Sequence, residues 1–360
     1  MIQSNKKWVI IFLTTFLILL SGAGAATVII DPYFHYHKPL PGLQYPLDLY
    51  KARYLNDGIM KHFDYDAVIT GSSLTDSFQA SEFDRLFGVN SVKVPFGGGS
   101  YKEMNDHLKI AVEYNPDLKT VFRCLDYHRL FDEADYMSYT EDIYPNYLYD
   151  NLLYNDVKYI FNKATLFEDT LPVLKYTQDG GQTTSFDMYC NWAKDAVFSK
   201  EVTDSNYPIP AKGAGVFYEN TEEDYAKITK NITQNVTDLA KEHPEIDFYL
   251  YFSPNNIYFW NDYYQAGLIV KQLDAEKYII ELLLQYENIH LFSFFTEYDM
   301  ICDLNNYLDT MHYSEEVHSQ ILHWMSEGVH ELTLDNYEDY CRQEREFYLN
   351  YDYDSLFPNN

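Results

Sequence analysis

The chain has 360 residues, and its 55 Asp and Glu outweigh its 26 Lys and Arg, so the formal net charge is −29. This charge excludes nucleic acid as an expected partner, because neutralising phosphates requires clustered Lys and Arg. A hydrophobic share of 46%, which includes 36 tyrosines, excludes wholesale disorder. The length fits one large domain or two ordinary ones.

An uncharged apolar run from Trp8 to Ile30 follows Lys6 and Lys7. At about 1.5 Å per residue, a helix of this length crosses the roughly 30 Å hydrocarbon core of a bilayer, and the lysines place its N-terminus in the cytoplasm. A cleavable signal peptide with Ala23-Gly24-Ala25 as its cleavage site is the alternative. We favour the retained anchor, because residues 27–30 stay apolar past that site. Both interpretations export the rest of the chain, either bound to the cell membrane or secreted.

Short apolar runs that end at Gly, Pro or Ser predict buried strands, and amphipathic stretches predict helices. The predicted strands are Ala67–Thr70, Ser91–Val94, Thr120–Leu125, Phe248–Phe252 and Ile289–Phe292. The predicted helices are Tyr101–Tyr114, a stretch that includes Tyr225 to Leu239, Gln265–Tyr286 and Ser314–Glu327. This alternation predicts an α/β fold, a three-layer α/β/α arrangement around a mostly parallel five-stranded sheet.

The segment 132–220 interrupts the alternation and is rich in Tyr. We interpret it as an insertion folded over the sheet, either part of a lid or binding wall or a structural excursion buried by its own rings. The predicted layout is a cytoplasmic tip and anchor at 1–30, an extracytoplasmic linker at 31–60, an α/β domain at 61–335 that contains the insertion, and an acidic, aromatic C-terminal tail at 336–360.

The cysteines are widely spaced and form no Cys-x-x-Cys pair, which argues against a zinc ribbon or a thioredoxin-like site. The spacing argues against a disulfide scaffold, and we expect buried free thiols, with one or two disulfide bridges as the alternative. Phosphate-binding and dinucleotide-binding glycine motifs are also absent from the sequence. The sequence therefore predicts neither a metal nor a cofactor. The four cysteines are Cys124, Cys190, Cys302 and Cys341.

The motif Gly71-Ser72-Ser73-Leu74 follows the first predicted strand. Ligands bind beyond the carboxyl ends of strands in open parallel sheets, so a serine on this turn is well placed as a nucleophile. Its backbone N–H can also point at a developing oxyanion. The alternative is a serine that caps the next helix.

A glycine cluster, Gly97-Gly98-Gly99-Ser100, follows the second predicted strand. Consecutive glycines let backbone N–H groups approach a ligand closely. A flexible turn without a ligand is the alternative.

The motif Asp309-Thr310-Met311-His312 precedes the last predicted helix of the α/β domain. An Asp three residues before a His can accept a hydrogen bond from Nδ1–H of the imidazole, which leaves Nε2 free to take a proton from a serine. The nucleophile elbow Gly-x-Ser-x-Gly and the metalloprotease motif His-Glu-x-x-His are absent from the sequence.

Taken in order, these motifs resemble the blocks of the SGNH (GDSL-like) hydrolase superfamily. Ser72 stands in the Asp slot of the Gly-Asp-Ser-Leu block and Ser73 in the nucleophile slot. Gly98, next to Gly99, resembles the second-block glycine, whose N–H helps to form the oxyanion hole. Asp309 and His312 resemble the last block.

A more specific resemblance is to membrane-anchored members that act on bacterial cell envelopes, which include the D-alanyl-lipoteichoic acid biosynthesis protein and the alginate O-acetylation proteins. It rests on the N-terminal span, Asp31-Pro32-Tyr33, the Gly-Ser-Ser turn and His312-Tyr313-Ser314.

One position departs from the family pattern. The third block supplies an Asn that donates to the oxyanion, and this sequence has Asp126 there. An ionised Asp cannot donate, so either Arg129 or His128 replaces the donor, or the hole has two donors, or catalysis is weak or lost. Asn255 is a further candidate for a polar group near the site.

The resemblance implies that Ser73 attacks an acyl ester, that His312 carries the proton, that Asp309 orients His312, and that the N–H groups of Ser73 and Gly98 hold the oxyanion. The expected activity is that of an extracytoplasmic serine esterase or O-acyltransferase acting on envelope polysaccharide or a teichoic-type polymer. The alternative is a non-catalytic surface protein that binds such a polymer or a membrane acyltransferase.

Overall fold

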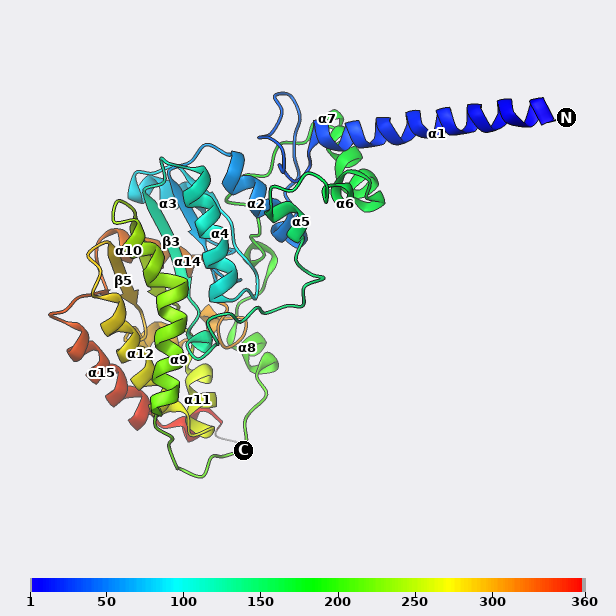
Figure 1. Cartoon of the computed structure of the whole chain (residues 1–360). Helices are drawn as coiled ribbons and strands as arrows, with labels where there is room; N and C mark the ends of the chain where they lie inside the picture. Colours follow the sequence, from blue (N-terminus) through cyan, green and yellow to red (C-terminus); the bar gives the residue numbers. More distant parts are fainter. Residues whose placement is uncertain (1, 358–360) are drawn as a thin grey trace. The chain divides into compact units, whose positions relative to one another are not determined.

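The computed structural model describes residues 2–357, with side chains from residue 6 onward. Its contacts divide the chain into two compact units (Figure 1). Unit 1 comprises Met1–Asp64 and Thr140–Ser185, and unit 2 comprises Tyr65–Tyr139 and Phe186–Asn360. The predicted linker at 31–60 thus belongs to unit 1, and the predicted insertion at 132–220 is divided between the units. Residues 358–360 of the predicted tail lie outside the described residues.

Unit 1 is helical and begins with α1 (Ile2–Ile30), in which Lys6–Ile30 is long and apolar enough to cross a membrane. A signal sequence near the N-terminus meets the same requirements of length and composition. The other elements of unit 1 are η1 (Leu49–Lys51), α2 (Ala52–His62), α5 (Asn146–Tyr149), α6 (Val157–Ile160), the π-helical η3 (Thr165–Thr170) and α7 (Leu171–Gln178).

The chain leaves α1 through Asp31, which is fully buried and has a φ of 46°. Its carboxylate accepts hydrogen bonds from the backbone amides of His35, Tyr36 and His37 at 3.0, 2.7 and 3.1 Å. It also accepts one from the Tyr159 hydroxyl at 2.7 Å. Asp31 therefore fixes the loop after α1 and ties it to α6.

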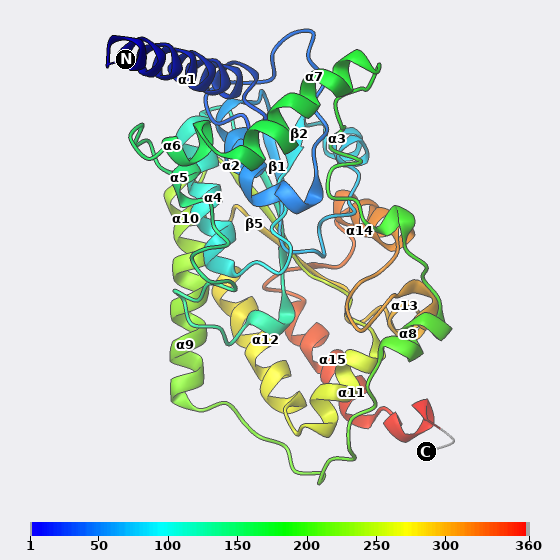
Figure 2. The same cartoon turned by 90° about the vertical axis from the view of Figure 1, so that its right-hand side faces the viewer.

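Unit 2 is built on one sheet with the strand order β2-β1-β3-β4-β5-β6 (Figures 1 and 2). All neighbouring pairs from β2 to β5 are parallel, and β6 pairs antiparallel with β5. The strands are β1 (Ala67–Thr70), β2 (Ser91–Lys93), β3 (Thr120–Leu125), β4 (Asp247–Phe252), β5 (Ile289–Ser293) and β6 (Glu331–Leu332).

The predicted α/β class and mostly parallel sheet are confirmed, but the predicted strand count is wrong, because the sheet has six strands and not five. The missed strand, β6, has two residues, which pair with Leu291 and Phe292 of β5. Two residues are too few to show the alternation of polar and apolar side chains that marks a strand in sequence.

Helices pack on both faces of the sheet. On one face, Phe122 of β3 and Tyr251 of β4 pack with Phe83 of α3 and Ile321 of α14. On the other face, Arg123 of β3 donates to carbonyls of α4 and η5. On that side, α9 and α12 lie next to each other (Figures 1 and 2). The larger helices of unit 2 are α3 (Ala80–Phe87), α4 (Tyr101–Tyr114), α9 (Glu222–Ile232), α11 (Ile257–Gln265), α12 (Ile269–Leu283), α14 (Glu315–Ser326) and α15 (Tyr337–Asn350).

The shorter helical elements of unit 2 lie mostly in its connecting segments. They are η2 (Tyr127–Arg129), η4 (Ala193–Asp195), α8 (Lys200–Asn206), the π-helical η5 (Thr233–Thr237), α10 (Asp238–Glu242), α13 (Tyr298–Cys302), η6 (Leu304–Asn306) and η7 (Tyr353–Leu356).

The helix predicted over Gln265–Tyr286 is broken in the structure between α11 and α12. Gly267 ends α11 with a φ of +73°, and its amide donates to the Tyr264 carbonyl. A Cβ at this position would collide with the Val216 carbonyl oxygen. The apolar spacing continues across the break, so only the glycine marks it in the sequence.

Two glutamates meet in the layer between α12 and α15. Glu276 and Glu344 are buried, and their carboxyl groups are in hydrogen-bond contact. The Tyr127 hydroxyl donates to Glu276 at 2.6 Å. Burial raises the pKa of both carboxyls, and the Glu276 charge raises that of Glu344 further. The folded chain therefore holds protons that the unfolded chain releases above the ordinary Glu pKa of 4.5.

We predict that stability falls as the pH rises from 4.5 through the raised pKa values of this pair. Glu344→Gln keeps a hydrogen-bond donor beside Glu276 and removes the group that must ionise. It should raise the free energy of unfolding at pH 8 by on the order of 1–3 kcal/mol and flatten the pH dependence. Urea unfolding at several pH values measures both. Glu346→Gln, at an exposed position on the same helix, is the control, and equal behaviour of the two variants would contradict the prediction.

Candidate active site

The first motif forms a tight turn at the carboxyl end of β1. Gly71 has a φ of +153°, and a Cβ there would press on the Thr75 side chain and on Cys124. The Thr75 amide and hydroxyl both donate to the Ser72 carbonyl, at 3.0 and 2.8 Å. This closed turn presents Ser73 at the edge of the sheet where the parallel strands end.

Ser73 contacts the histidine that the sequence pairs with it. Ser73 Oγ lies 2.8 Å from His312 Nε2, and His312 Nδ1 lies 2.7 Å from Asp309 Oδ2. Ser73 and His312 are 239 residues apart in the chain. The three side chains form a continuous hydrogen-bonded series in the order that proton transfer from serine requires.

The loop before α14 is held rigidly around Asp309. The amides of Met311 and His312 donate to Asp309 Oδ1, each at 2.8 Å. The Asn256 side chain donates to the Asp309 carbonyl at 2.7 Å. The carboxylate therefore faces the imidazole in a fixed orientation, without depending on the rest of the site.

Burial lowers the pKa of His312, but the hydrogen bond and the negative charge of Asp309, together with the charges of Asp76 and Asp126, raise it by more, so the pKa lies above its ordinary value. Burial raises the pKa of Asp309, and the His312 ring and the two amides outweigh that effect. Asp309 therefore stays ionised beside an imidazole of increased basicity, as a general base requires.

The glycine cluster lies against the serine turn. The Phe96 amide donates to the Gly71 carbonyl at 2.8 Å, which joins the two loops. Gly98 has a φ of +65°, and a Cβ there would collide with the Tyr139 hydroxyl, which donates to the Gly97 carbonyl at 3.1 Å. Glycine is thus required for both the backbone conformation and the close approach of the ring.

Two backbone amides of these loops are free to bind a ligand. Within residues 2–357, the amides of Ser73 and Gly98 donate no hydrogen bond. The Gly99 amide, by contrast, donates to the Phe96 carbonyl at 2.6 Å and is used inside the turn. Of the predicted neighbours, Gly99 therefore supports the loop, and Gly98 and Ser73 present the available donors.

Asp126 lies beside the serine turn at the end of β3. It is fully buried, and its Oδ1 accepts a hydrogen bond from Ser72 Oγ at 2.7 Å. Its Oδ2 has no hydrogen-bond partner among the described residues. The Tyr101 hydroxyl donates to its carbonyl at 3.1 Å. Asp126 thus contacts Ser72 and acts there as a hydrogen-bond acceptor.

Arg129 is brought to the glycine loop. Its Nη2 donates to the Gly98 carbonyl at 2.9 Å, and its Nη1 contacts Asp132 at 3.0 Å. These bonds fix the position of Gly98. His128, the other predicted substitute donor, is exposed.

Asn255 is buried after β4, and its side-chain oxygen accepts from the Ser253 hydroxyl at 3.0 Å. Among the described residues, no hydrogen bond connects its side chain to Ser73, His312 or Asp309. The neighbouring Asn256 provides the contact with Asp309 instead.

Trp192 is a site residue that the sequence did not identify. Its ring packs nearly perpendicular to the His312 ring, with centroids 5.2 Å apart, and its indole N–H donates to the Ser73 carbonyl at 3.4 Å. It covers one side of the imidazole with an apolar surface. No motif surrounds it, and only its place in the aromatic-rich segment at 132–220 could have drawn attention to it.

Lys93 was also missed. It is fully buried, and its ammonium donates to the carbonyls of Asp76 and Phe78 at 2.6 and 2.9 Å. Burial lowers the pKa of Lys93 to about 8. The Lys93 side chain extends from β2 to the segment that follows Ser73, and its hydrogen bonds to the carbonyls there hold the turn in place.

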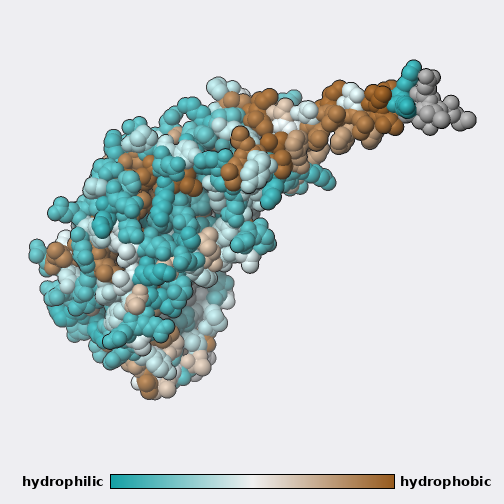
Figure 3. Space-filling model, viewed as in Figure 1, coloured by the Kyte–Doolittle hydropathy of each residue, from teal (hydrophilic) through white to brown (hydrophobic). Residues whose placement is uncertain are grey.

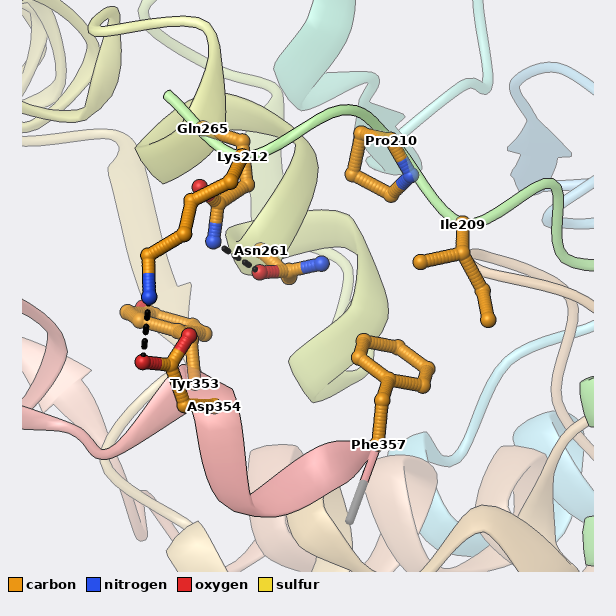
Figure 4. Close-up of a pocket in the computed structure, with 8 residues that line it drawn as sticks. All are labelled: Ile209, Pro210, Lys212, Asn261, Gln265, Tyr353, Asp354 and Phe357. Atoms are coloured by element: carbon orange, nitrogen blue, oxygen red, sulfur yellow. Dashed lines mark hydrogen bonds and ion pairs between the residues drawn. The ribbon is translucent and has the colours of Figure 1, made fainter. Parts of the chain in front are cut away.

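A separate cavity of about 500 Å³ lies along the far half of α11 (Figure 4). The Lys212–Asp354 ion pair and the Gln265–Asn261 hydrogen bond lie in its wall. It contains no predicted site residue. The lining residues are Ile209, Pro210, Lys212, Asn261, Gln265, Tyr353, Asp354 and Phe357.

No family model matches the chain, and no curated protein matches it. A solved structure from Streptococcus pneumonia, provisionally described as a platelet activating factor, is similar at 13% identity and a TM-score of 0.36. The match covers 82% of this chain and 92% of that chain. At this distance the likeness says nothing about the activity of the chain.

We predict that Asp309→Asn lowers the pKa of His312, because the hydrogen bond and the charge of Asp309, which oppose the effect of burial most strongly, are then lost. The measurement is the titration of the His312 ring carbon by NMR. Asp132→Asn, which removes a carboxylate bound to Arg129, should leave that pKa unchanged. A His312 pKa that does not fall in Asp309→Asn would contradict the geometry described above.

Proposed function

We propose that this chain is an extracytoplasmic serine esterase or O-acyltransferase of cell-envelope polymers, with Ser73 as the nucleophile. The observation that carries the proposal is the hydrogen-bonded series from Ser73 through His312 to Asp309 at 2.8 and 2.7 Å. A serine, a histidine and a carboxylate in this order support acyl transfer on many unrelated folds.

In the proposed reaction, Ser73 Oγ forms a bond to the ester carbonyl carbon while its proton passes to His312 Nε2. Collapse of the tetrahedral intermediate breaks the bond to the leaving alcohol, which takes the proton from His312. The resulting acyl-enzyme is attacked by water in an esterase or by a polymer hydroxyl in a transferase. His312 removes the proton of that second nucleophile and returns it to Ser73.

The free amides of Ser73 and Gly98 would hold the oxyanion, which makes a hole with two backbone donors. Arg129 fixes the Gly98 loop by its bond to the carbonyl. Asp126, an acceptor, would add no donor in its ionised form. Removing one donor of such a hole typically costs about 2.7–4 kcal/mol, so we expect slower acyl transfer than in a three-donor site.

The substrate class follows from charge and aromatic surface. The net charge of −29 opposes a strongly anionic polymer unless counterions screen it, so esters on a neutral polysaccharide suit the chain better. Trp192 and Tyr139 lie next to the triad and the glycine loop and offer ring faces for sugars. The proposed chemistry uses no metal or nucleotide cofactor.

A second candidate function is a non-catalytic surface protein that binds envelope polymer or a membrane acyltransferase. The acceptor Asp126 in place of a donor favours it. The proposed partners in both cases are an envelope polymer or acyl donor and the membrane that α1 can enter.

We predict that a fluorophosphonate probe labels the wild-type chain and not Ser73→Ala. Labelling should weaken as the pH falls through the raised pKa of His312, because a protonated imidazole cannot take the serine proton. Gel fluorescence of the purified chain measures both effects.

Ser77→Ala is the matched control, because Ser77 is buried four positions further on and its hydroxyl has no partner among the described residues. It should be labelled like the wild type. Equal labelling of Ser73→Ala, or none of the wild type, would overturn the catalytic proposal in favour of the binding function.

We predict that Asp126→Asn raises turnover of an aryl acetate ester by roughly 10- to 100-fold, because an amide can keep the bond from Ser72 and add a donor near the oxyanion. Steady-state kinetics should place the gain in kcat rather than in KM. Asp126→Ala, which loses the contact with Ser72 and adds no donor, should not show it. Unchanged kcat in Asp126→Asn would mean that this side chain does not face the oxyanion.

A further inference from the structure

The last two turns of α1 are packed by other parts of unit 1. A Cβ at Gly24 would lie 2.9 Å from Phe161 and 3.0 Å from Ile160, so these side chains rest directly on the glycine. Thr27 is fully buried. From Trp8 to Leu20, by contrast, the side chains of α1 are exposed. α6 and η3 provide the contacts with α1.

Helix geometry places this packing below the membrane surface. With Lys6 and Lys7 at the cytoplasmic edge, the helix rises about 24 Å over the seventeen residues from Trp8 to Gly24, which is less than the roughly 30 Å of hydrocarbon in a bilayer. No proline interrupts the helix. If α1 spans a membrane, Gly24 and the rings that rest on it therefore lie inside the outer half of the bilayer.

The segment that packs on α1 also displays apolar side chains outward. Five of these side chains, which we call the apolar collar, are 50% to 77% exposed. Figure 3 shows hydrophobic surface along α1 and again at its base. A surface of this kind is rarely left in water, and here it is continuous with a helix of membrane length. The collar consists of Leu153, Tyr154, Val157, Phe161 and Phe167.

Two lysines of the segment fit an interface between lipid and water, and Glu168, beside Phe167, is its exposed carboxylate. Lys158 and Lys163 stand on either side of Phe161 and are exposed. Lysines can lay their stems along apolar surface and reach lipid phosphates with the ammonium. Asp156 and Asp169 are turned inward, where they accept hydrogen bonds from Tyr36 and Tyr33 at 2.9 and 2.6 Å.

We infer that the apolar collar is inserted in the outer half of the lipid bilayer, around the exit of α1. Unit 1 is then a membrane-embedded base, in which α1 and the collar enter the lipid together. The Asp31 network locks the two to each other through Tyr159. In this arrangement Ala23-Gly24-Ala25 is helical and Phe161 rests on Gly24, so a signal peptidase finds no extended site there and α1 is retained.

The test uses the full chain in liposomes that contain phosphatidylcholine brominated on its acyl chains, which quenches tryptophan that touches lipid. The starting protein is Trp8→Phe, and Phe161→Trp and Val157→Trp are introduced into it separately. Each new tryptophan should lose most of its added emission in brominated vesicles compared with unbrominated ones. Leu334→Trp, at a 71% exposed position of unit 2, should lose none.

Trp8 of the unmodified chain reports whether α1 itself is inserted. Quenching of Trp8 without quenching at positions 157 and 161 would overturn the collar and leave the anchor intact. Thermal unfolding of each variant confirms that the fold is kept. In cell membranes, a photoreactive phenylalanine at position 161 should form adducts with phospholipid. Exclusive adducts with a protein would overturn the inference, because the surface would then be a protein interface.

Discussion

The candidate site depends on one constraint, the common edge at which the parallel strands end. β1, β2 and β3 pair in register, so the turn after β1 and the loops after β2 and β3 open on the same side. Ser73 comes from the first of these, the Gly98 amide from the second and Asp126 from the third. The loop before α14 carries His312 and completes the site through the hydrogen bond between His312 and Ser73.

Buried and half-buried polar groups make this edge rigid. Lys93 donates to two carbonyls beneath the serine turn, Asp126 accepts from Ser72, and Arg129 holds the Gly98 carbonyl. A buried charge without partners is costly, so each of these groups favours the one loop conformation that satisfies it. The amides that remain free, at Ser73 and Gly98, are those proposed to meet the substrate oxygen, and the buried network keeps them in place without using them.

The acidic residues and the apolar helix of membrane length occupy different parts of the chain. This separation bears on both the membrane contact and the substrate of the candidate site. The apolar helix carries no acidic residue, so the acidity belongs to the part after it. Anionic headgroups repel an acidic surface, whereas they do not repel the apolar collar or the neighbouring Lys158 and Lys163. Unit 1, through α1 and the apolar collar, would therefore hold a negatively charged protein at the membrane by apolar contacts. The negative charge of the protein would disfavour strongly anionic polymers as substrates.

The sequence by itself determined the α/β class, the strands β1 and β3, the helix α4 and the pairing of Asp309 with His312, because each depends on local apolar runs, capping residues or spacing. It did not reveal β6, whose two residues carry no pattern, or the break at Gly267 within continuous apolar spacing. Trp192 and Lys93 reach the site through contacts across 119 and 17 residues of chain, and no local signal marks them. Only the tertiary structure decided these contacts, because the path of the chain, and not its local composition, sets which distant side chains meet.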